Sequence, residues 1–309
     1  MHRNLEAIIH PQKTNAVLKA LAELPDVIQL SVFRATSVKP AGLDVIHIQV
    51  LNSGTDAALS IIRDESEDQF FSIATAETDA LINAAHSKRI EDDVDEALWE
   101  EVETGLRHNS RLTPNFLLLM AIGGILAATG FVADDQLQVI VFIAAAVIAP
   151  GLEPLAKIPL GIVLKRRRAL LYGLRSALVG YTVILLGAMA SFFILQLTGD
   201  GTATQFLEDS FTKSMQETLP KDWIISVAAA SASIIMYLSY RRNVIAGPLI
   251  ALVAIPATSA IGIALLIGEF ALAGRIAGRL GTEVAVTIVI GMLFILAKQW
   301  WVHKRKPLV

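Results

Sequence analysis

Residues Ala144–Gly161 read AAAVIAPGLEPLAKIPLG, and they decide how the rest of the chain is interpreted. The stretch lies inside a long apolar region but holds Pro150, Pro154 and Pro159, three prolines within ten residues. Proline removes a backbone donor and clashes with the preceding turn, so a regular helix cannot continue through all three. Inside a bilayer, a broken backbone is tolerated only where protein or a water-filled cavity satisfies its polar groups. The stretch therefore predicts an interrupted membrane helix, with Pro150 and Gly151 at the interruption.

The composition divides the chain into an acidic part and an apolar, basic part. The whole chain is 54% hydrophobic with a mean hydropathy of +0.56, which is too apolar for one ordinary soluble domain. Residues 1–110 carry a net charge of −10, and residues 111–309 carry +7. We therefore expect a soluble domain followed by a membrane domain. The chain has no cysteine, which excludes disulfides and thiolate chemistry.

The first 88 residues predict a small α+β domain. Apolar, β-rich runs alternate with helical spacing in the order βαββαβ, over residues 5–10, 13–24, 27–36, 44–51, 55–64 and 69–76. In the run 44–51, Ile46 and Ile48 alternate with His47 and Gln49, so one face of that strand is expected to be buried. The order of elements predicts a ferredoxin-like sandwich over residues 1–88. Its second face would be open, with Ile8, Phe33 and His47 on it, and we expect another subunit or the following helix to cover it.

Residues 89–110 predict an acidic linker helix. Val94, Leu98 and Val102 recur at helical spacing, which gives the helix an apolar stripe for packing on the sheet or on the membrane domain.

Residues 111–309 predict an all-α polytopic membrane domain of six helices. A span needs about 20 mostly apolar residues, and the candidate spans cover residues 114–131, 136–164, 169–198, 223–240, 243–268 and 281–301. A short interfacial helix is expected over Ala271–Leu280, which carries Arg275 and Arg279. Lys and Arg near the span ends favour one side by twelve to four, which places both termini in the cytoplasm and residues 199–222 outside.

The six spans resemble two sets of three. The second span is broken at Pro150 and Pro154, and the fifth is expected to be broken at Gly247-Pro248 and Pro256. Because each set has an odd number of spans, the two sets must have opposite orientations. Paired Gly/Pro-interrupted segments are the best sequence indication of a transporter-type binding site. The prediction is a 3+3 inverted repeat with a site between broken helices two and five.

The run AIGGILAATGFVADDQLQVIVFIAAAVIAPGLEPLAKIPLGIVL, residues 121–164, resembles a bacterial and archaeal family of hydrophobic membrane proteins, the domain of unknown function 389. Ile148-Ala149-Pro150 and Pro154 fit that family's pattern, as does the Pro-containing run Ile250–Gly262. The resemblance covers about residues 110–265. Ala145, Ala146 and Glu153 depart from the family pattern. The resemblance implies a multi-pass protein of the cytoplasmic (inner) membrane and assigns no activity.

Glu153 and Lys157 are the first candidates for chemistry, because charged side chains deep in a bilayer are costly and seldom incidental. They are spaced i, i+4, so they share a helical face if the helix resumes at Pro154. One interpretation is an ion or proton site in which Glu153 titrates and Lys157 is its counter-charge. The alternative is a structural ion pair, or a Lys157 that extends toward the cytoplasmic interface.

Thr258 and Ser259 are the second candidates, since they follow Pro256, where a broken helix would restart. Freed backbone amides and hydroxyls at such a point can hold an anion or a carboxylate. The alternative is helix–helix packing, in which Ser and Thr are common.

Other classes of function find little support in the sequence. The run Lys165–Arg168 indicates topology or binding of anionic lipid, and an acidic soluble half argues against nucleic acid. No metal-ligand spacing, phosphate loop, dinucleotide fingerprint or nucleophile elbow is present, so we expect no metal, no cofactor and no enzymatic activity. Two hypotheses remain. The first is a secondary transporter or channel for a small solute or ion, with the soluble domain serving regulation or assembly as a homo-oligomer. The second is a membrane-anchored sensor or scaffold whose soluble domain binds a ligand or partner.

Overall fold

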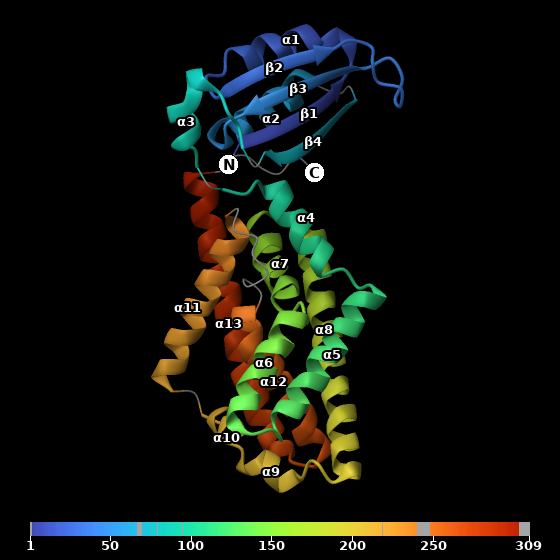
Figure 1. Ribbon diagram of the computed structural model, residues 1–309, viewed down its shortest axis with the longest axis vertical. Helices are drawn as coiled ribbons and strands as arrows, with labels where there is room; N and C mark the ends of the chain where they lie inside the picture. The colour runs from blue at the N-terminus through green and yellow to red at the C-terminus, as the bar shows by residue number, and fades with distance from the viewer. Residues whose placement is uncertain are drawn as a thin grey trace. The chain divides into compact units, whose positions relative to one another are not determined.

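The computed structural model describes residues 2–66, 70–78, 80–94, 96–217, 219–239 and 248–302. The chain forms two compact units, one that runs to Leu98 and one that runs from Trp99 to Val302. The first unit holds a β-sheet, and the second has helices and no strand among the described residues (Figure 1).

The first unit is a four-stranded antiparallel sheet with two main helices. In chain order its elements are β1 (His2–Ile9), α1 (Pro11–Ala22), β2 (Val27–Phe33), β3 (Asp44–Val50), α2 (Asn52–Ser66), β4 (Phe71–Thr78), the 3-10 helix η1 (Ala84–His86) and α3 (Ser87–Glu91). The strand order in the sheet is β2-β3-β1-β4, with every neighbouring pair antiparallel. The small antiparallel sheet with helices that the sequence predicts is therefore present.

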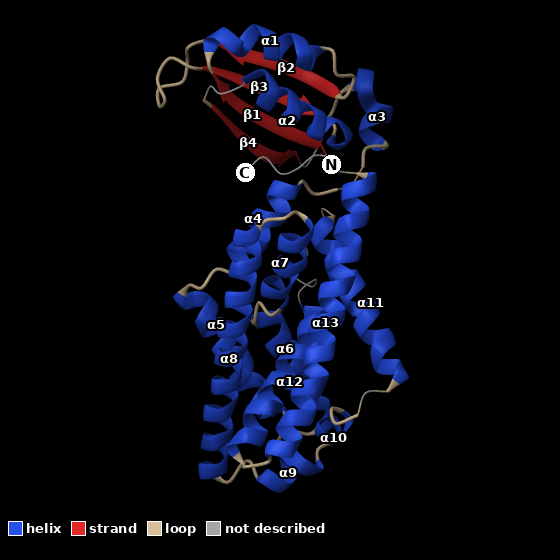
Figure 2. Cartoon of the chain, turned by 180° about the vertical axis from the view of Figure 1, so that it is seen from behind, coloured by secondary structure: helices blue, strands red, loops and turns tan. Residues whose placement is uncertain are grey.

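One face of this sheet forms the core of the unit. Ile46, Ile48 and Val50 on β3 are fully buried, as the alternation in the sequence predicts. Val17 of α1 and Leu59 of α2 pack into the same cluster, so both helices cover this face (Figure 2).

The opposite face of the sheet carries an aromatic and charged group of side chains. Phe33 and His47 meet edge to face with ring centroids 5.2 Å apart. The Nε2 atom of His47 lies 3.1 Å from a carboxylate oxygen of Glu6 on the neighbouring strand. Phe33 is 49% exposed within the chain, so this face has apolar surface that a partner can bury.

The single helix expected over residues 89–110 is divided in two. Helix α3 ends at Glu91, and the next helix, α4, begins at Trp99. The Asp93 carboxylate accepts hydrogen bonds from the backbone N–H groups of Asn52 and Ser53, at 2.8 and 3.2 Å, where α2 begins. Negative charge is favoured at that helix end. Because Leu98 also enters the core of the sheet unit, this segment packs on the first unit and does not continue as a helix.

The second unit consists of ten helices in the described residues. They are α4 (Trp99–Asn109), α5 (Pro114–Gly130), α6 (Asp135–Ile148), α7 (Leu152–Val163), α8 (Arg167–Thr198), α9 (Ala203–Glu208), α10 (Ser210–Ser214), α11 (Pro220–Leu238), α12 (Pro248–Leu266) and α13 (Phe270–Trp301). Helices α8, α11 and α13 are long and apolar enough to cross a membrane. The bent pairs α4/α5, at 68°, and α6/α7, at 49°, raise that number to five if each pair is one span. Three to five apolar helices of this kind are typical of a membrane protein.

Close contact between α5 and α8 depends on glycine. A Cβ added at Gly124 of α5 would lie 2.1 Å from the carbonyl oxygen of Ile184 on α8. One added at Gly187 of α8 would lie 2.6 Å from the carbonyl oxygen of Ala121. Small residues allow membrane helices to approach in this way, because van der Waals packing drives their association.

Helices α11 and α13 run parallel and are tied near both ends. At the start of α11, Asp222 lies 3.5 Å from Arg279 of α13. At its end, the Lys298 ammonium donates a hydrogen bond to the carbonyl oxygen of Leu238. Helix α13 runs unbroken from Phe270, so the separate interfacial helix expected over Ala271–Leu280 is wrong. Arg279 in this basic turn donates hydrogen bonds to the carbonyl oxygens of Ser214, at the end of α10, and Glu217, before α11.

Candidate functional site

The interruption expected at Pro150 separates α6 from α7. Helix α6 ends at Ile148 and α7 begins at Leu152, with a bend of 49° between them. The Tyr181 hydroxyl of α8 donates a hydrogen bond of 3.1 Å to the carbonyl oxygen of Gly151. A side chain of the protein thus satisfies part of the broken backbone. Pro154 does not break the chain a second time, because it lies in the first turn of α7, where proline costs no helical hydrogen bond.

Glu153 occupies the first turn of α7 and is 8% exposed. Its Oε1 atom accepts a hydrogen bond of 2.8 Å from the Tyr237 hydroxyl of α11. The Oε2 atom of Glu153 is buried and has no hydrogen-bond partner in the described part of the chain. The site therefore holds a buried carboxylate with one oxygen bonded to Tyr237 and the other still available.

The expected pairing of Glu153 with Lys157 is wrong. No ion pair joins them among the residues that the structure describes, and the Tyr237 hydroxyl is the partner of Glu153 instead. Lys157 is 4% exposed and packs toward α8, where a Cβ added at Gly173 would lie 2.8 Å from the Lys157 Cβ. The two side chains are four residues apart, but the packing of α8 and α11 gives them different neighbours.

The second break, expected at Pro256, is also wrong. Helix α12 runs without interruption from Pro248 to Leu266, and Pro256 lies inside it. Ile255 and Ala257 beside it are almost completely buried, and packed neighbours allow a membrane helix to tolerate proline. The Thr258 hydroxyl donates to the Ala254 carbonyl of its own helix at 2.6 Å, so no free helix start exists there.

Ser259 is fully buried, and its hydroxyl has no partner in the described residues. The structure therefore does not gather Thr258 and Ser259 into an anion site with a helix N-terminus. Gly247, together with Arg241, Arg242 and Asn243 at the start of the same expected span, lies outside the described residues.

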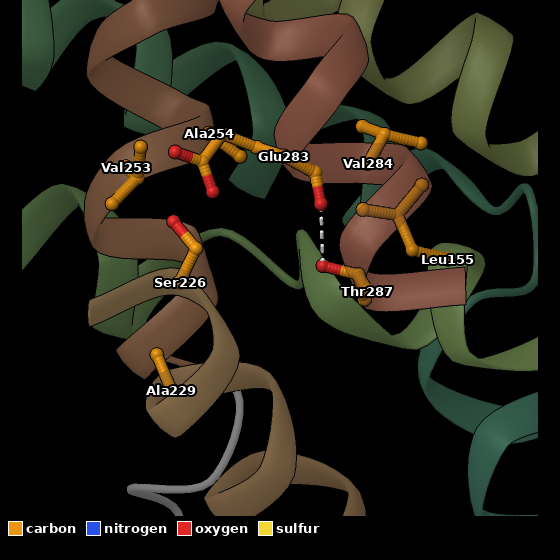
Figure 3. Close-up of a pocket in the computed structure, with 8 residues that line it drawn as sticks. All are labelled: Leu155, Ser226, Ala229, Val253, Ala254, Glu283, Val284 and Thr287. Carbon is orange, nitrogen blue, oxygen red and sulfur yellow. Dashed lines mark hydrogen bonds between the residues drawn. The ribbon is translucent and has the colours of Figure 1, made fainter. Parts of the chain in front are cut away.

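A small cavity lies among α7, α11, α12 and α13 (Figure 3). Its volume is about 10 Å³, the room that one water molecule needs. The lining residues come from all four helices and are Leu155, Ser226, Ala229, Val253, Ala254, Glu283, Val284 and Thr287. Figure 3 shows the Glu283 carboxylate and the Ser226 hydroxyl turned toward each other. The polar side chains of the cavity come from α11 and α13, and α7 and α12 contribute apolar ones.

Tyr237 and Glu283 are the residues that the sequence analysis missed. Tyr237 is 84 residues from Glu153, and no pattern in the sequence connects the two. Glu283 had a usable signal, because it is an acidic residue in a long apolar helix, and such residues are functional candidates by default. The described residues contain no group of three or more His, Cys, Asp or Glu side chains that could hold a metal ion.

Comparison with known proteins gives one match. The family model described as Domain of unknown function (DUF389) matches residues 146–290, which confirms the resemblance found in the sequence. The matched segment begins in α6 and ends in α13, later at both ends than the 110–265 expected, and it contains Glu153 and every residue of the cavity. No curated protein and no solved structure matches the chain.

Proposed function

We propose that this protein is a secondary transporter or channel for a small solute or ion. Its helical unit carries the matched domain of unknown function. The observation that carries the proposal is Glu153, a buried carboxylate beside an interrupted helix with one oxygen unpartnered among the described residues. Burying a charged side chain at that depth costs free energy, so its presence indicates a functional role. Its charge also limits the chemistry, because it favours a cation or a proton over an anion.

The architecture that we propose around this site has six spans: α5, the broken pair α6/α7, α8, α11, α12 and α13. In the first three, α5 and α7 both pack against α8, and in the last three, α11 and α12 both pack against α13. The same pattern of packing in both halves supports a 3+3 inverted repeat. The proposed location is the cytoplasmic membrane of a bacterium or archaeon, with both termini inside.

For the first unit we propose a ferredoxin-like fold and a role in regulation or assembly. The βαββαβ order and the strand order β2-β3-β1-β4 support the fold. The exposed face around Phe33 and His47 supports assembly as a homo-oligomer.

That same face supports the second candidate function, a membrane-anchored sensor or scaffold that binds a ligand or partner there. The two candidates differ in what they need from Glu153. Transport needs its carboxylate, whereas a sensor needs only a stable anchor.

The test is a flux screen in proteoliposomes that contain the full chain and a trapped pH-sensitive dye, under imposed gradients of protons, Na⁺, K⁺, phosphate and amino acids. Glu153→Gln keeps the size of the side chain and an oxygen for Tyr237, and it removes the charge. We expect it to abolish flux while the protein stays folded. The matched control is Glu208→Gln, which makes the same change at an exposed residue of α9 and should leave flux unchanged. Full flux in Glu153→Gln, or none in the wild type under any gradient, would contradict transport through this site.

A further inference from the structure

Two polar rows face each other along the parallel helices α11 and α13. Asp222 and Ser226 lie one turn apart on α11, and Arg279, Glu283 and Thr287 follow at the same spacing on α13. Asp222 meets Arg279 at 3.5 Å, and one turn further along both helices Ser226 and Glu283 line the same cavity. Asp222 and Arg279 carry opposite charges and form an ion pair. Ser226 and Glu283, the second pair, are a hydroxyl and a carboxylate, so this pair contains no positive charge.

Arg279 forms no ion pair with Glu283, because its two terminal nitrogens are directed to other partners; its Nε atom has no partner in the described residues. Besides its contact with Asp222, Arg279 donates hydrogen bonds to the carbonyl oxygens of Ser214 and Glu217. No hydrogen bond or ion pair joins a described residue to the Glu283 carboxylate. Helices α7 and α12 contribute only apolar side chains to the cavity. The Glu283 carboxylate therefore has no directly bonded positive side chain in the described residues.

The hydroxyls at the cavity present oxygens as acceptors. Ser226 donates its proton to the Asp222 carbonyl at 2.8 Å, and Thr287 donates its proton to the Glu283 carbonyl at 2.9 Å, the bond drawn in Figure 3. With both protons used within their own helices, the lone pairs of Ser226 and Thr287 remain for a guest. The residues that line the cavity therefore include one carboxylate and two hydroxyls.

We propose that this cavity binds Na⁺ as the coupling ion of the transporter, an inference that rests on the proposed function. Oxygen ligands with a single negative charge suit a hard monovalent cation. Ca²⁺ sites usually draw on several Asp and Glu carboxylates among their oxygen ligands, whereas this cavity has a single carboxylate. A partly dehydrated Na⁺ needs about the room of a water molecule. The site differs from the one at Glu153, because its side chains come from the interface of α11 and α13.

The test measures binding without using flux. The thermal unfolding midpoint of the full chain in lipid nanodiscs is followed while NaCl replaces choline chloride at constant ionic strength and constant alkaline pH. Bound Na⁺ stabilises the folded state by mass action, so the wild-type midpoint should rise with Na⁺. Glu283→Gln should abolish the rise, and Ser226→Ala should shift it to several-fold higher Na⁺. Glu269→Gln, the same change at an exposed residue before α13, should respond like the wild type.

Two outcomes overturn the site. They are a wild-type midpoint that does not depend on Na⁺, and a Na⁺ response that survives in both Glu283→Gln and Ser226→Ala. Should Glu283→Gln fail to fold, the shifted response of Ser226→Ala still decides the question. Solute flux without any Na⁺ response would refute this site and leave transport standing. A Na⁺ response lost in Glu283→Gln without any solute flux would support the site and refute transport.

Discussion

The contact of α5 with α8 at Gly124 gives a prediction whose size follows from the structure. In Gly124→Ala, the new methyl group would lie 2.1 Å from the Ile184 carbonyl oxygen, whereas ordinary contacts begin at 3.4 Å. The obstacle is backbone, so one helix must move away by more than 1 Å. Overpacking of this kind costs about 1–3 kcal/mol of the free energy of unfolding. Alanine also favours a helix over glycine by about 0.5–1 kcal/mol, which partly offsets that cost.

Gly274→Ala is the matched control. It makes the same change inside α13, where a Cβ would meet nothing within 4 Å. Since both variants gain the same helix propensity, Gly124→Ala should be less stable than Gly274→Ala by about 1–3 kcal/mol. The measurement is unfolding by SDS in mixed micelles, followed by tryptophan fluorescence. Equal free energies of unfolding for the two variants would refute the packing argument.

Three further predictions follow from other parts of the chain. Lys298→Met should lower the free energy of unfolding by about 1–3 kcal/mol, because the buried Leu238 carbonyl loses its donor; unchanged SDS unfolding would contradict this. In this cysteine-free chain, an impermeant thiol reagent should label Asp209→Cys and not His303→Cys in intact cells, and the reverse pattern would invert the proposed topology. Phe33→Glu should reduce the mass of the detergent-solubilised particle by light scattering, since it places a charge on the face proposed for assembly, and an unchanged mass would exclude that face.

The parts of the fold that the sequence predicted correctly depend on local signals. The alternation of Ile46 and Ile48 with polar residues predicted a half-buried strand. Both isoleucines are fully buried, which confirms the face that points inward. Pro150 and Gly151 marked the end of α6, because these residues stop a helix largely through their own backbone geometry, whatever packs around them. Pro256 shows the limit of that signal. Its effect depends on whether neighbouring helices pack tightly enough to keep α12 intact, and the sequence of α12 alone does not contain that information.

The candidate site was harder to predict, because its partners come from distant helices. Glu153 was recognised by its charge, but its partner was sought at Lys157, one turn away on the same helix. The actual donor, Tyr237, reaches it from α11. The register between α11 and α13 sets the neighbours of Glu283. It places Ser226 opposite Glu283, one turn beyond the pair Asp222 and Arg279. Such a register is a property of two packed helices, and a single sequence gives no measure of it.

The two cations that tie α13 to α11 also indicate how thick a bilayer this protein fits. Arg279 and Lys298 are 19 residues apart on one helix, a distance of about 28 Å at a rise of about 1.5 Å per residue. The hydrocarbon core of a typical bilayer is about 30 Å thick. Trp223 lies beside Asp222 near one boundary, and Trp300 and Trp301, 76% and 80% exposed, lie just past the other, where an aromatic belt is expected. A bilayer of typical thickness therefore fits α13 with little hydrophobic mismatch, and a thicker one would have to thin locally around it.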